Sequence, residues 1–317
     1  MTDTEAKEAK NAKEYEEGVK RCLAELPQGL TLVDLPQSRP GFRQFISSWF
    51  FVDGLGRRVV VDPGPASTVP LLLENLSSLT NGVDLVLVTH IHIDHSGGIG
   101  QFCARFPDAK VVAHPKGVRH LIEPGKLWRH SLDVLGDLVA MYGEPAPLDP
   151  ARLLDGLPGV TVLETPGHAP HHVTYIVPFG DGRLFFAGES AGLSIPLPKP
   201  YFRPTTPPKF DGAAEQRTLR LLAEALQDGD TLCYAHWGAA RDPLARLALA
   251  EQQLASWLSL ASQMRDQPEE VVMERLLAED PLLSGYAALP KDVKEREDIF
   301  IRNSVKGVLM CLEERKA

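Results

Sequence analysis

Short apolar runs that end in glycine, proline or a charged residue recur along the first 115 residues of the chain. The run "RRVVVDPGP" (residues 57–65) is β-branched and closed by turn residues, which predicts a buried strand. The stretch "VPLLLENLSSL" (residues 69–79) instead repeats its leucines at helical spacing. Strands and helices alternate in short succession, which indicates an α/β fold. The predicted strands are residues 29–36, 44–54, 57–65, 83–90 and 109–115, and the predicted helices are residues 69–79 and 99–107.

The later part of the chain changes character more than once. Residues 115–150 predict two helices separated by a Pro–Gly break, and three strands are expected within residues 159–190. Residues 194–210 are rich in proline and lack periodicity, which predicts a long extended loop of the kind that is often functional. A helix over residues 213–227 and a strand over residues 230–238 follow.

Three regions are therefore expected along the chain. The first is a helical N-terminal segment whose helix covers residues 14–26, after a polar and frayed start. The second is a mixed α/β (α+β) unit, and the third consists of three or four amphipathic helices without a strand signal. The boundaries are residues 1–27, residues 28–240 with a helical insert at about 115–150 and the proline-rich loop at 194–210, and residues 241–317.

Composition and charge narrow the classes of function. The 33 basic and 42 acidic residues give a net charge of −9, which argues against a nucleic-acid binder. No apolar run approaches the ~18 residues of a membrane span, and the first residues contain no apolar segment typical of a signal peptide. The four cysteines are scattered without a CxxC pair, which favours free thiols in a reducing compartment. We expect a cytoplasmic protein that binds neither nucleic acid nor a membrane.

The stretch "THIHIDHSGG" (residues 89–98) carries the strongest chemical signal. An apolar strand ends at His90, and His92, Asp94 and His95 follow within five residues. Three imidazoles and a carboxylate so close together would repel one another if charged and would be costly to bury if unpaired. Neutral imidazole and carboxylate oxygen are ligands for zinc and iron, so a divalent cation is expected here.

Other apolar strands also end on residues that can bind a metal. "ETPGH" places His168 after a Pro–Gly turn, "FFAGES" places Glu189 just past an apolar strand, and "LCYAHWG" does the same for His236. In a layered α/β fold such strand ends can converge on one edge, where a site would form. Asp62 ends an earlier strand; it either orients a ligating imidazole or caps the turn, and the sequence favours neither.

These residues together resemble the metallo-β-lactamase superfamily. The resemblance rests on the HxHxDH run, the later Pro-Gly-His, the strand-end carboxylate and the strand-end histidine, and it covers roughly residues 28–240. It implies a four-layer αββα sandwich with metal ions at one edge of the two sheets. The helical region that follows is similar in layout to glyoxalase II.

The resemblance also implies a ligand set for two divalent ions, most simply zinc, with iron or manganese as alternatives. It places His90, His92 and His168 around the first ion and Asp94, His95 and His236 around the second. The family usually has an aspartate as the bridge between the ions, whereas this chain has Glu189, whose arm is longer by one methylene. Binding of the second ion therefore depends on whether the end of the strand before Glu189 lies further from the site, so that the longer side chain still fits between the ions.

The implied chemistry is hydrolysis by a metal-bound hydroxide. Two cations ~3.5–4 Å apart lower the pKa of a bridging water and polarise the substrate oxygen. Asp94 would orient the nucleophile and return its proton. The insert and the proline-rich loop are expected to shape the pocket for a small-molecule substrate, with His172, Tyr201 and Arg203 as candidate contacts. The helical tail and insert offer surfaces for a homodimer.

Three classes of activity fit this site. The leading hypothesis is a hydrolase of an ester, thioester or lactone. The sequence lacks the glutathione-binding signature of glyoxalase II in its tail, and Gly192 stands where the quorum-quenching lactonases usually carry a tyrosine. The second class is a mono- or di-iron redox enzyme similar to persulfide dioxygenases, and the third is a metal-dependent nuclease or phosphodiesterase.

Overall fold

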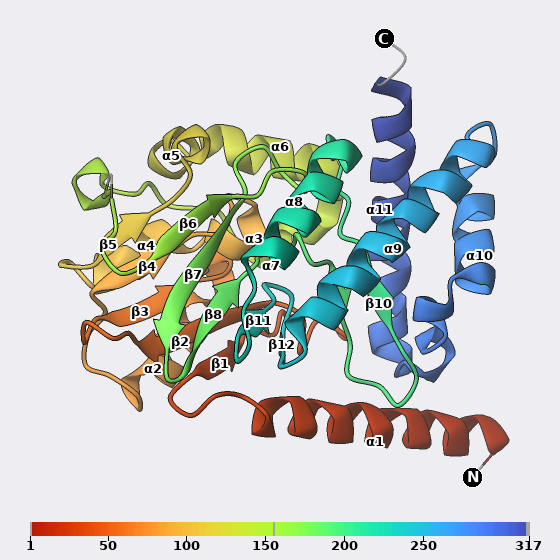
Figure 1. Ribbon diagram of the computed structural model, residues 1–317, viewed down its shortest axis with the longest axis horizontal. Helices are drawn as coiled ribbons and strands as arrows, with labels where there is room; N and C mark the ends of the chain where they lie inside the picture. Colours follow the sequence, from red (N-terminus) through yellow and green to blue (C-terminus); the bar gives the residue numbers. More distant parts are fainter. Residues whose placement is uncertain (1, 155, 315–317) are drawn as a thin grey trace.

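The computed structural model describes residues 2–154 and 156–314 of the 317-residue chain. Two five-stranded mixed sheets form its centre (Figure 1). The first, called here the N-terminal sheet, has the order β1-β2-β3-β4-β5, and the second, the C-terminal sheet, has the order β12-β11-β8-β7-β6. The strands of the N-terminal sheet are β1 (Thr31–Asp34), β2 (Ser47–Val52), β3 (Arg58–Val61), β4 (Leu85–Leu87) and β5 (Lys110–Val112). Those of the C-terminal sheet are β6 (Thr161–Glu164), β7 (Val173–Phe179), β8 (Gly182–Phe186), β11 (Thr231–Cys233) and β12 (Ala239–Ala240).

The strand register places one row of apolar side chains on each face of each sheet. In the N-terminal sheet Trp49 pairs with Val61 and Val61 with Leu87, and all three side chains belong to the core shared by the two sheets. Their partners from the C-terminal sheet include Tyr175 and Phe186, which pair with each other. Because side chains alternate across a strand, the intervening residues face outward. Both faces are therefore apolar, so each sheet needs a helical cover.

Helices cover both outer faces. On the N-terminal sheet Val60 and Val86 belong to the same apolar cluster as Leu72 of α2 and Phe102 of α4. On the C-terminal sheet the outward residues meet α8 in that cluster. The expected αββα sandwich is thus confirmed. The helices of this central part are α2 (Val69–Ser77), α3 (Ile93–Ser96), α4 (Ile99–Arg105), α5 (Pro115–Ile122), α6 (Gly125–Leu135), α7 (Val139–Tyr142) and α8 (Gly212–Ala225).

The three C-terminal helices are α9 (Pro243–Gln263), α10 (Glu269–Glu279) and α11 (Lys291–Glu314). Figure 1 shows them grouped beside the sandwich, with α1 running below them. Their buried residues, such as Trp257 and Ile301, lie in the same cluster as the outer faces of the sheets. The C-terminal helices therefore share one hydrophobic cluster with the outer faces of the sheets, and the core between the two sheets is a second cluster.

Two sequence predictions about local structure were wrong. Helix α1 covers Asp3–Ala24 rather than starting at residue 14, because Thr2 and Glu5 form a capping box that stabilises its first turn. The proline-rich segment is not entirely loop. It contains a short hairpin of β9 (Leu193–Ser194) and β10 (Phe202–Arg203).

Two smaller expectations can be compared directly with the structure. Within the described parts of the chain, no helix combines the length and the apolar character needed to cross a bilayer. All four cysteines are free, and only Cys22 is partly exposed.

Candidate metal centre

The HxHxDH motif (residues 90–95) follows β4 and continues into α3, which contains Asp94 and His95. The chain leaves the sheet with the backbone carbonyl of Thr89 accepting a hydrogen bond from Val173, which ties the loop to the other sheet. Helix α3 then turns back against the turn that follows β3, and a side chain at Gly98 would clash with the backbone there, with its Cβ 3.0 Å from the carbonyl oxygen of Gly64. The small residues after His95 are thus needed for close packing, and this packing aims Asp94 and His95 at the sheet edge.

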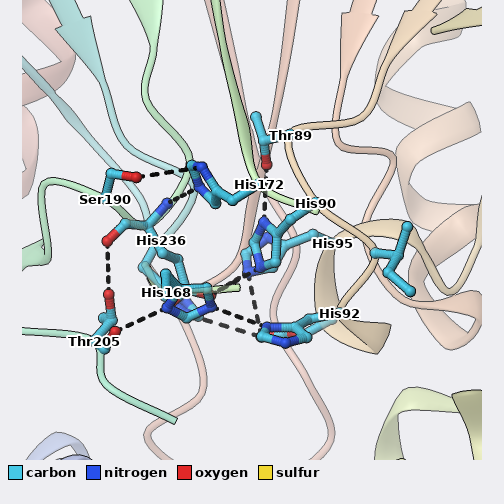
Figure 2. A network of polar contacts seen from close by, with 12 residues as sticks. Thr89, His90, His92, His95, His168, His172, Ser190, Thr205 and His236 are labelled. Carbon is cyan, nitrogen blue, oxygen red and sulfur yellow. Dashed lines mark hydrogen bonds and ion pairs between the residues drawn. The ribbon is translucent and has the colours of Figure 1, made fainter. Parts of the chain in front are cut away.

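All seven residues expected as metal ligands converge at this edge. They form two groups, and within each group one nitrogen or oxygen atom per residue lies within 4.8 Å of all the others. Figure 2 shows the histidine rings gathered from several strand ends. Glu189 belongs to both groups. The first group is His90, His92, His168 and Glu189, and the second is Asp94, His95, His236 and Glu189.

Glu189 stands between the two groups with both carboxylate oxygens engaged. Its Oε1 lies 3.3 Å from Nε2 of His90 and 3.4 Å from Nε2 of His168, while its Oε2 lies 3.3 Å from Nε2 of His236. Oε1 also lies 3.1 Å from Nε2 of His95. Burial alone raises the pKa of Glu189, but His168 and His236 outweigh this and hold the pKa well below its usual range. Glu189 is therefore a carboxylate that contacts both groups.

Backbone oxygens fix the tautomers of two histidines. Nδ1 of His168 lies 2.8 Å from the carbonyl of Thr205, and Nδ1 of His236 lies 3.2 Å from the carbonyl of Phe45. A carbonyl can only accept, so each Nδ1 carries the proton. In the neutral ring Nε2 then has a free lone pair, and in both residues this atom faces the centre.

A hydroxyl relay orients His90. Thr89 donates its side-chain hydroxyl and its backbone N–H to the carboxylate of Asp62, at 2.7 and 2.8 Å, and its Oγ1 lies 3.1 Å from Nδ1 of His90. Since the hydroxyl proton goes to the carboxylate, Thr89 accepts from His90. Asp62 therefore acts on the imidazole through Thr89 rather than by direct contact. Its backbone lies in the left-handed region (φ 51°), which fits a residue held in place for its side chain.

The donor set fits a pair of divalent cations. Nε2 of His90 is buried and has no hydrogen-bond partner in the described structure, and its neighbour at 3.3 Å is a carboxylate oxygen that also offers only lone pairs. Ligands ~2.0–2.2 Å from a tetrahedral zinc ion lie roughly 3.3–3.6 Å from one another. The contact between His92 Nδ1 and His168 Nε2 is 3.0 Å, and that between His95 Nε2 and Asp94 is 3.4 Å. The lone pairs of these nitrogen and oxygen atoms converge at short distances, so a cation between them would stabilise the arrangement.

The pKa shifts of the histidines in the cluster also favour cation binding. Burial lowers the pKa of His90 and His92 well below the usual value, so both rings are neutral and able to ligate. His95 behaves differently. Burial lowers its pKa, but Asp94 and Glu189 outweigh burial and raise the pKa to about 9. The two carboxylates thus attract a cation to the second group.

Three supporting residues had not been expected from the sequence. Glu215 of α8 is buried and accepts the backbone N–H of His168 at 2.7 Å. Burial raises its pKa well above the usual value. The ring of Phe45 stacks on His236 at 4.3 Å and receives Arg296 of α11 on its face at 4.4 Å. None of these contacts has a local sequence signal, since each depends on long-range packing.

A cavity of about 130 Å³ opens above the cluster, between α6 and α11. Of His172, Tyr201 and Arg203, only Arg203 lines it. His172 lies behind the site, where its Nε2 accepts the backbone N–H of Glu189 at 3.1 Å. Tyr201 is fully buried and donates to Glu297. The placement of His172 and Tyr201 in the pocket was therefore wrong, because the turn after His168 and the β9–β10 hairpin direct both side chains into the core.

A sequence model of the metallo-beta-lactamase superfamily matches residues 42–236, and the chain belongs to this family. The match includes every residue of the two ligand groups. It also covers both sheets except β1 and β12.

Among curated proteins the chain is similar to hydroxyacylglutathione hydrolases. That of Photobacterium profundum is 34% identical over 153 residues, which cover 47% of this chain and 48% of the relative. That of Serratia proteamaculans is 28% identical over 198 residues, or 59% and 60% of the two chains. The chain thus spans about half the length of the first of these relatives and somewhat more of the second.

Solved structures match over more of the chain, at lower identity. A beta-lactamase domain protein from Burkholderia ambifaria aligns with a TM-score of 0.62 at 18% identity, covering 92% of this chain and 88% of that one. The metallo-beta-lactamase superfamily protein ST1585 from Sulfolobus tokodaii aligns with a TM-score of 0.59 at 22% identity, covering 87% and 97%. At these identities the matches support the fold alone.

Proposed function

We propose that this chain is a hydrolase that uses two divalent metal ions, most simply zinc, to cleave a thioester or a related ester. The observation that carries the proposal is the shared carboxylate. Glu189 presents Oε1 to the first ligand group and Oε2 to His236 of the second, so one side chain can contact two ions. The longer arm of glutamate is accommodated without separating the groups.

The residues of the chain divide the work of hydrolysis. Bound divalent ions supply Lewis-acid polarisation of a carbonyl oxygen and lower the pKa of water. Asp94 lines the cavity, and its Oδ2 lies 3.4 Å from Nε2 of His95 and 3.8 Å from Nε2 of His236. This carboxylate can hold a water by a hydrogen bond and pass its proton to the leaving group. The fixed rings of His168 and His236 keep the reacting atoms in one geometry.

The substrate class is supported by similarity. The curated relatives are named hydroxyacylglutathione hydrolase, a name that describes thioester hydrolysis. The match is partial, so we extend only the bond type to this chain and not the glutathione group.

Metal analysis of natively expressed protein, followed by a panel of esters, thioesters and lactones, tests the proposal. We expect two equivalents of metal per chain and loss of hydrolysis after chelation, with recovery on adding zinc. An oxygen electrode provides the counter-test, because iron together with thiol-dependent oxygen uptake would replace hydrolysis with redox chemistry. Cleavage of RNA or DNA in place of the ester panel would favour a phosphodiesterase.

A further inference from the structure

The walls of the cavity differ sharply from its floor. The floor is formed by metal-cluster residues such as Asp94, Glu189 and His236. One wall is α6, which presents Leu127, Ser131 and Val134 at helical spacing of four and three residues, so they share one face. The opposite wall belongs to α11 and to the proline-rich segment. Its lining residues include Phe300, Asn303, Pro207 and Pro208.

The apolar side chains of these walls are incompletely buried. Leu127 is 8% exposed, while Val134, Leu135 and Phe300 are only half-buried although they belong to packed helices. Their remaining exposure faces a cavity that is continuous with the metal cluster. Covering such surface is worth ~25 cal/mol per Å², so an apolar group that reaches from the cluster into this space would be stabilised.

The charges of the lining residues also favour an apolar group in the cavity. Apart from histidines, Arg203 is the one cationic side chain among the lining residues, and the described structure contains no lysine there. Arg203 is 2% exposed, and its Nε donates to Glu297 at 2.6 Å, while its buried Nη2 has no hydrogen-bond partner in the described structure. The carboxylate of Glu297 therefore balances its charge within the core. A substrate arm with carboxylates, such as glutathione, would find no exposed cation other than histidine in this lining and would lie beside Asp94 and Glu189.

We infer that the substrate carries an uncharged, apolar acyl chain, which lies between α6 and α11 with its carbonyl carbon at the metal cluster. This inference rests on the proposed hydrolase function and names its substrate class. The polar residues of the lining include Ser131, Asn303 and His130, of which His130 is exposed, and they leave room for a polar leaving group that departs toward solvent. Water attacks the carbonyl carbon, the bond to the leaving oxygen or sulfur breaks, and that atom takes the proton released by the water.

Chain-length series test the inference with two matched variants on one helix. Leu135 lines the cavity, whereas Leu132 is 42% exposed and is not among the lining residues. For the unaltered protein we expect kcat/KM on neutral thioesters to rise roughly three- to four-fold per added methylene from acetyl to octanoyl. Leu135→Trp should flatten this rise, and Leu132→Trp should leave it unchanged. An active enzyme with no chain-length preference, or one that prefers a glutathione thioester over a neutral thioester of the same acyl chain, would overturn the inference.

A binding measurement separates this failure from failure of the proposed function. Octanoate and acetate are titrated by calorimetry into the metal-loaded protein and both variants. We expect octanoate to bind at least ten-fold more tightly than acetate, with the difference reduced in Leu135→Trp alone. If every ester, thioester and lactone resists hydrolysis but octanoate still binds more tightly than acetate, the apolar pocket is supported and the hydrolase function is refuted. Equal binding of the two acids overturns the pocket whatever the activity.

Discussion

The metal cluster and the cavity walls are built from different kinds of element. The ligands come from the ends of strands and from α3. Most of them are buried, and residues such as Thr89 and Thr205 fix them by accepting hydrogen bonds from their rings. The walls come from helices outside the two sheets, and their apolar side chains are fixed by packing alone. Changes in the cluster should therefore remove the chemistry outright, whereas changes in the walls should redirect it.

The two parts nevertheless meet at one buried group of charges. Glu297 of α11 binds Arg203 and Arg296 at 2.6 and 2.9 Å, and Arg296 covers Phe45, which stacks on His236. The metal cluster and the cavity walls thus differ in how their side chains are held, although they share this buried group of charges. The following predictions test how far the two parts behave independently.

The largest effect is expected from removing a ligand. In His92→Ala the first group loses one of its four donors. Changes to residues that only support a ligand cost about 10- to 100-fold in metal affinity, so loss of the ligand itself should exceed this and reduce hydrolysis to background. Metal content and kcat measure it. His120→Ala, a histidine of α5 outside both groups, is the control, and full activity in His92→Ala would refute the assignment.

Glu297→Gln tests the link between the walls and the cluster. Glu297 is fully buried; burial raises its pKa, but Arg203 and Arg296 outweigh burial and hold the pKa at about 2. Removing its charge leaves two buried guanidinium groups uncompensated, which should lower the free energy of unfolding by about 3–5 kcal/mol. Urea denaturation measures this loss.

Glu297→Gln should also change how the stability of the fold depends on pH. The pKa of Glu297 is lower in the folded chain than its usual 4.5, so its stabilisation is complete above pH 4.5 and is lost as the pH falls toward about 2. Glu297→Gln should lack this component of acid sensitivity. Glu270→Gln, at an exposed ion pair with Arg302, should leave stability nearly unchanged because solvent screens such a pair. Equal losses in the two variants would contradict the role of the buried group.

Glu189→Asp probes the bridge with a smaller change. The strand end cannot move forward to compensate, because the backbone N–H of Glu189 is held by His172 and a Cβ at Gly188 would already lie 2.2 Å from that ring. The shorter carboxylate should fail to reach both groups. We expect metal content to fall from two ions to one per chain, and retention of two ions would mean that the backbone is more adaptable than its contacts indicate.

Asp62→Asn should have the mildest effect in this series. The variant keeps an oxygen near Thr89 but removes the charge that holds the hydroxyl relay to His90. Metal affinity should fall about 10- to 100-fold, as measured by competition with a chelator. Asp84→Asn, which alters a surface pair with Arg58, should leave affinity unchanged. An equal loss in both variants would point to general destabilisation of the sheet.

Features that depend on residues close together in the sequence could be predicted more easily than features that depend on distant residues. Asp94 and His95 could be recognised because their motif places several donors within six residues. His168, Glu189 and His236 could be recognised because each follows an apolar strand. The start of α1 was also readable in principle, since Thr2 and Glu5 have the spacing of a capping box.

The pocket could not be read in the same way. His172 is four residues from His168, yet the intervening turn places its ring behind Glu189. His130 is exposed and also lines the cavity, because α6 lies across from α11. Helical periodicity shows that a face exists but not which partner it meets. The residues that define the pocket are therefore set by long-range packing, which one sequence does not reveal.

The position of Phe45 has a consequence for how the protein is made. This ring joins His236 to a helix that begins at Lys291, so the second ligand group gains this support only after α11 has been synthesised. A growing chain that has not reached α11 already contains the HxHxDH residues. Full metal loading would then mark the docking of α11, and metal acquisition would serve as a check that folding is complete.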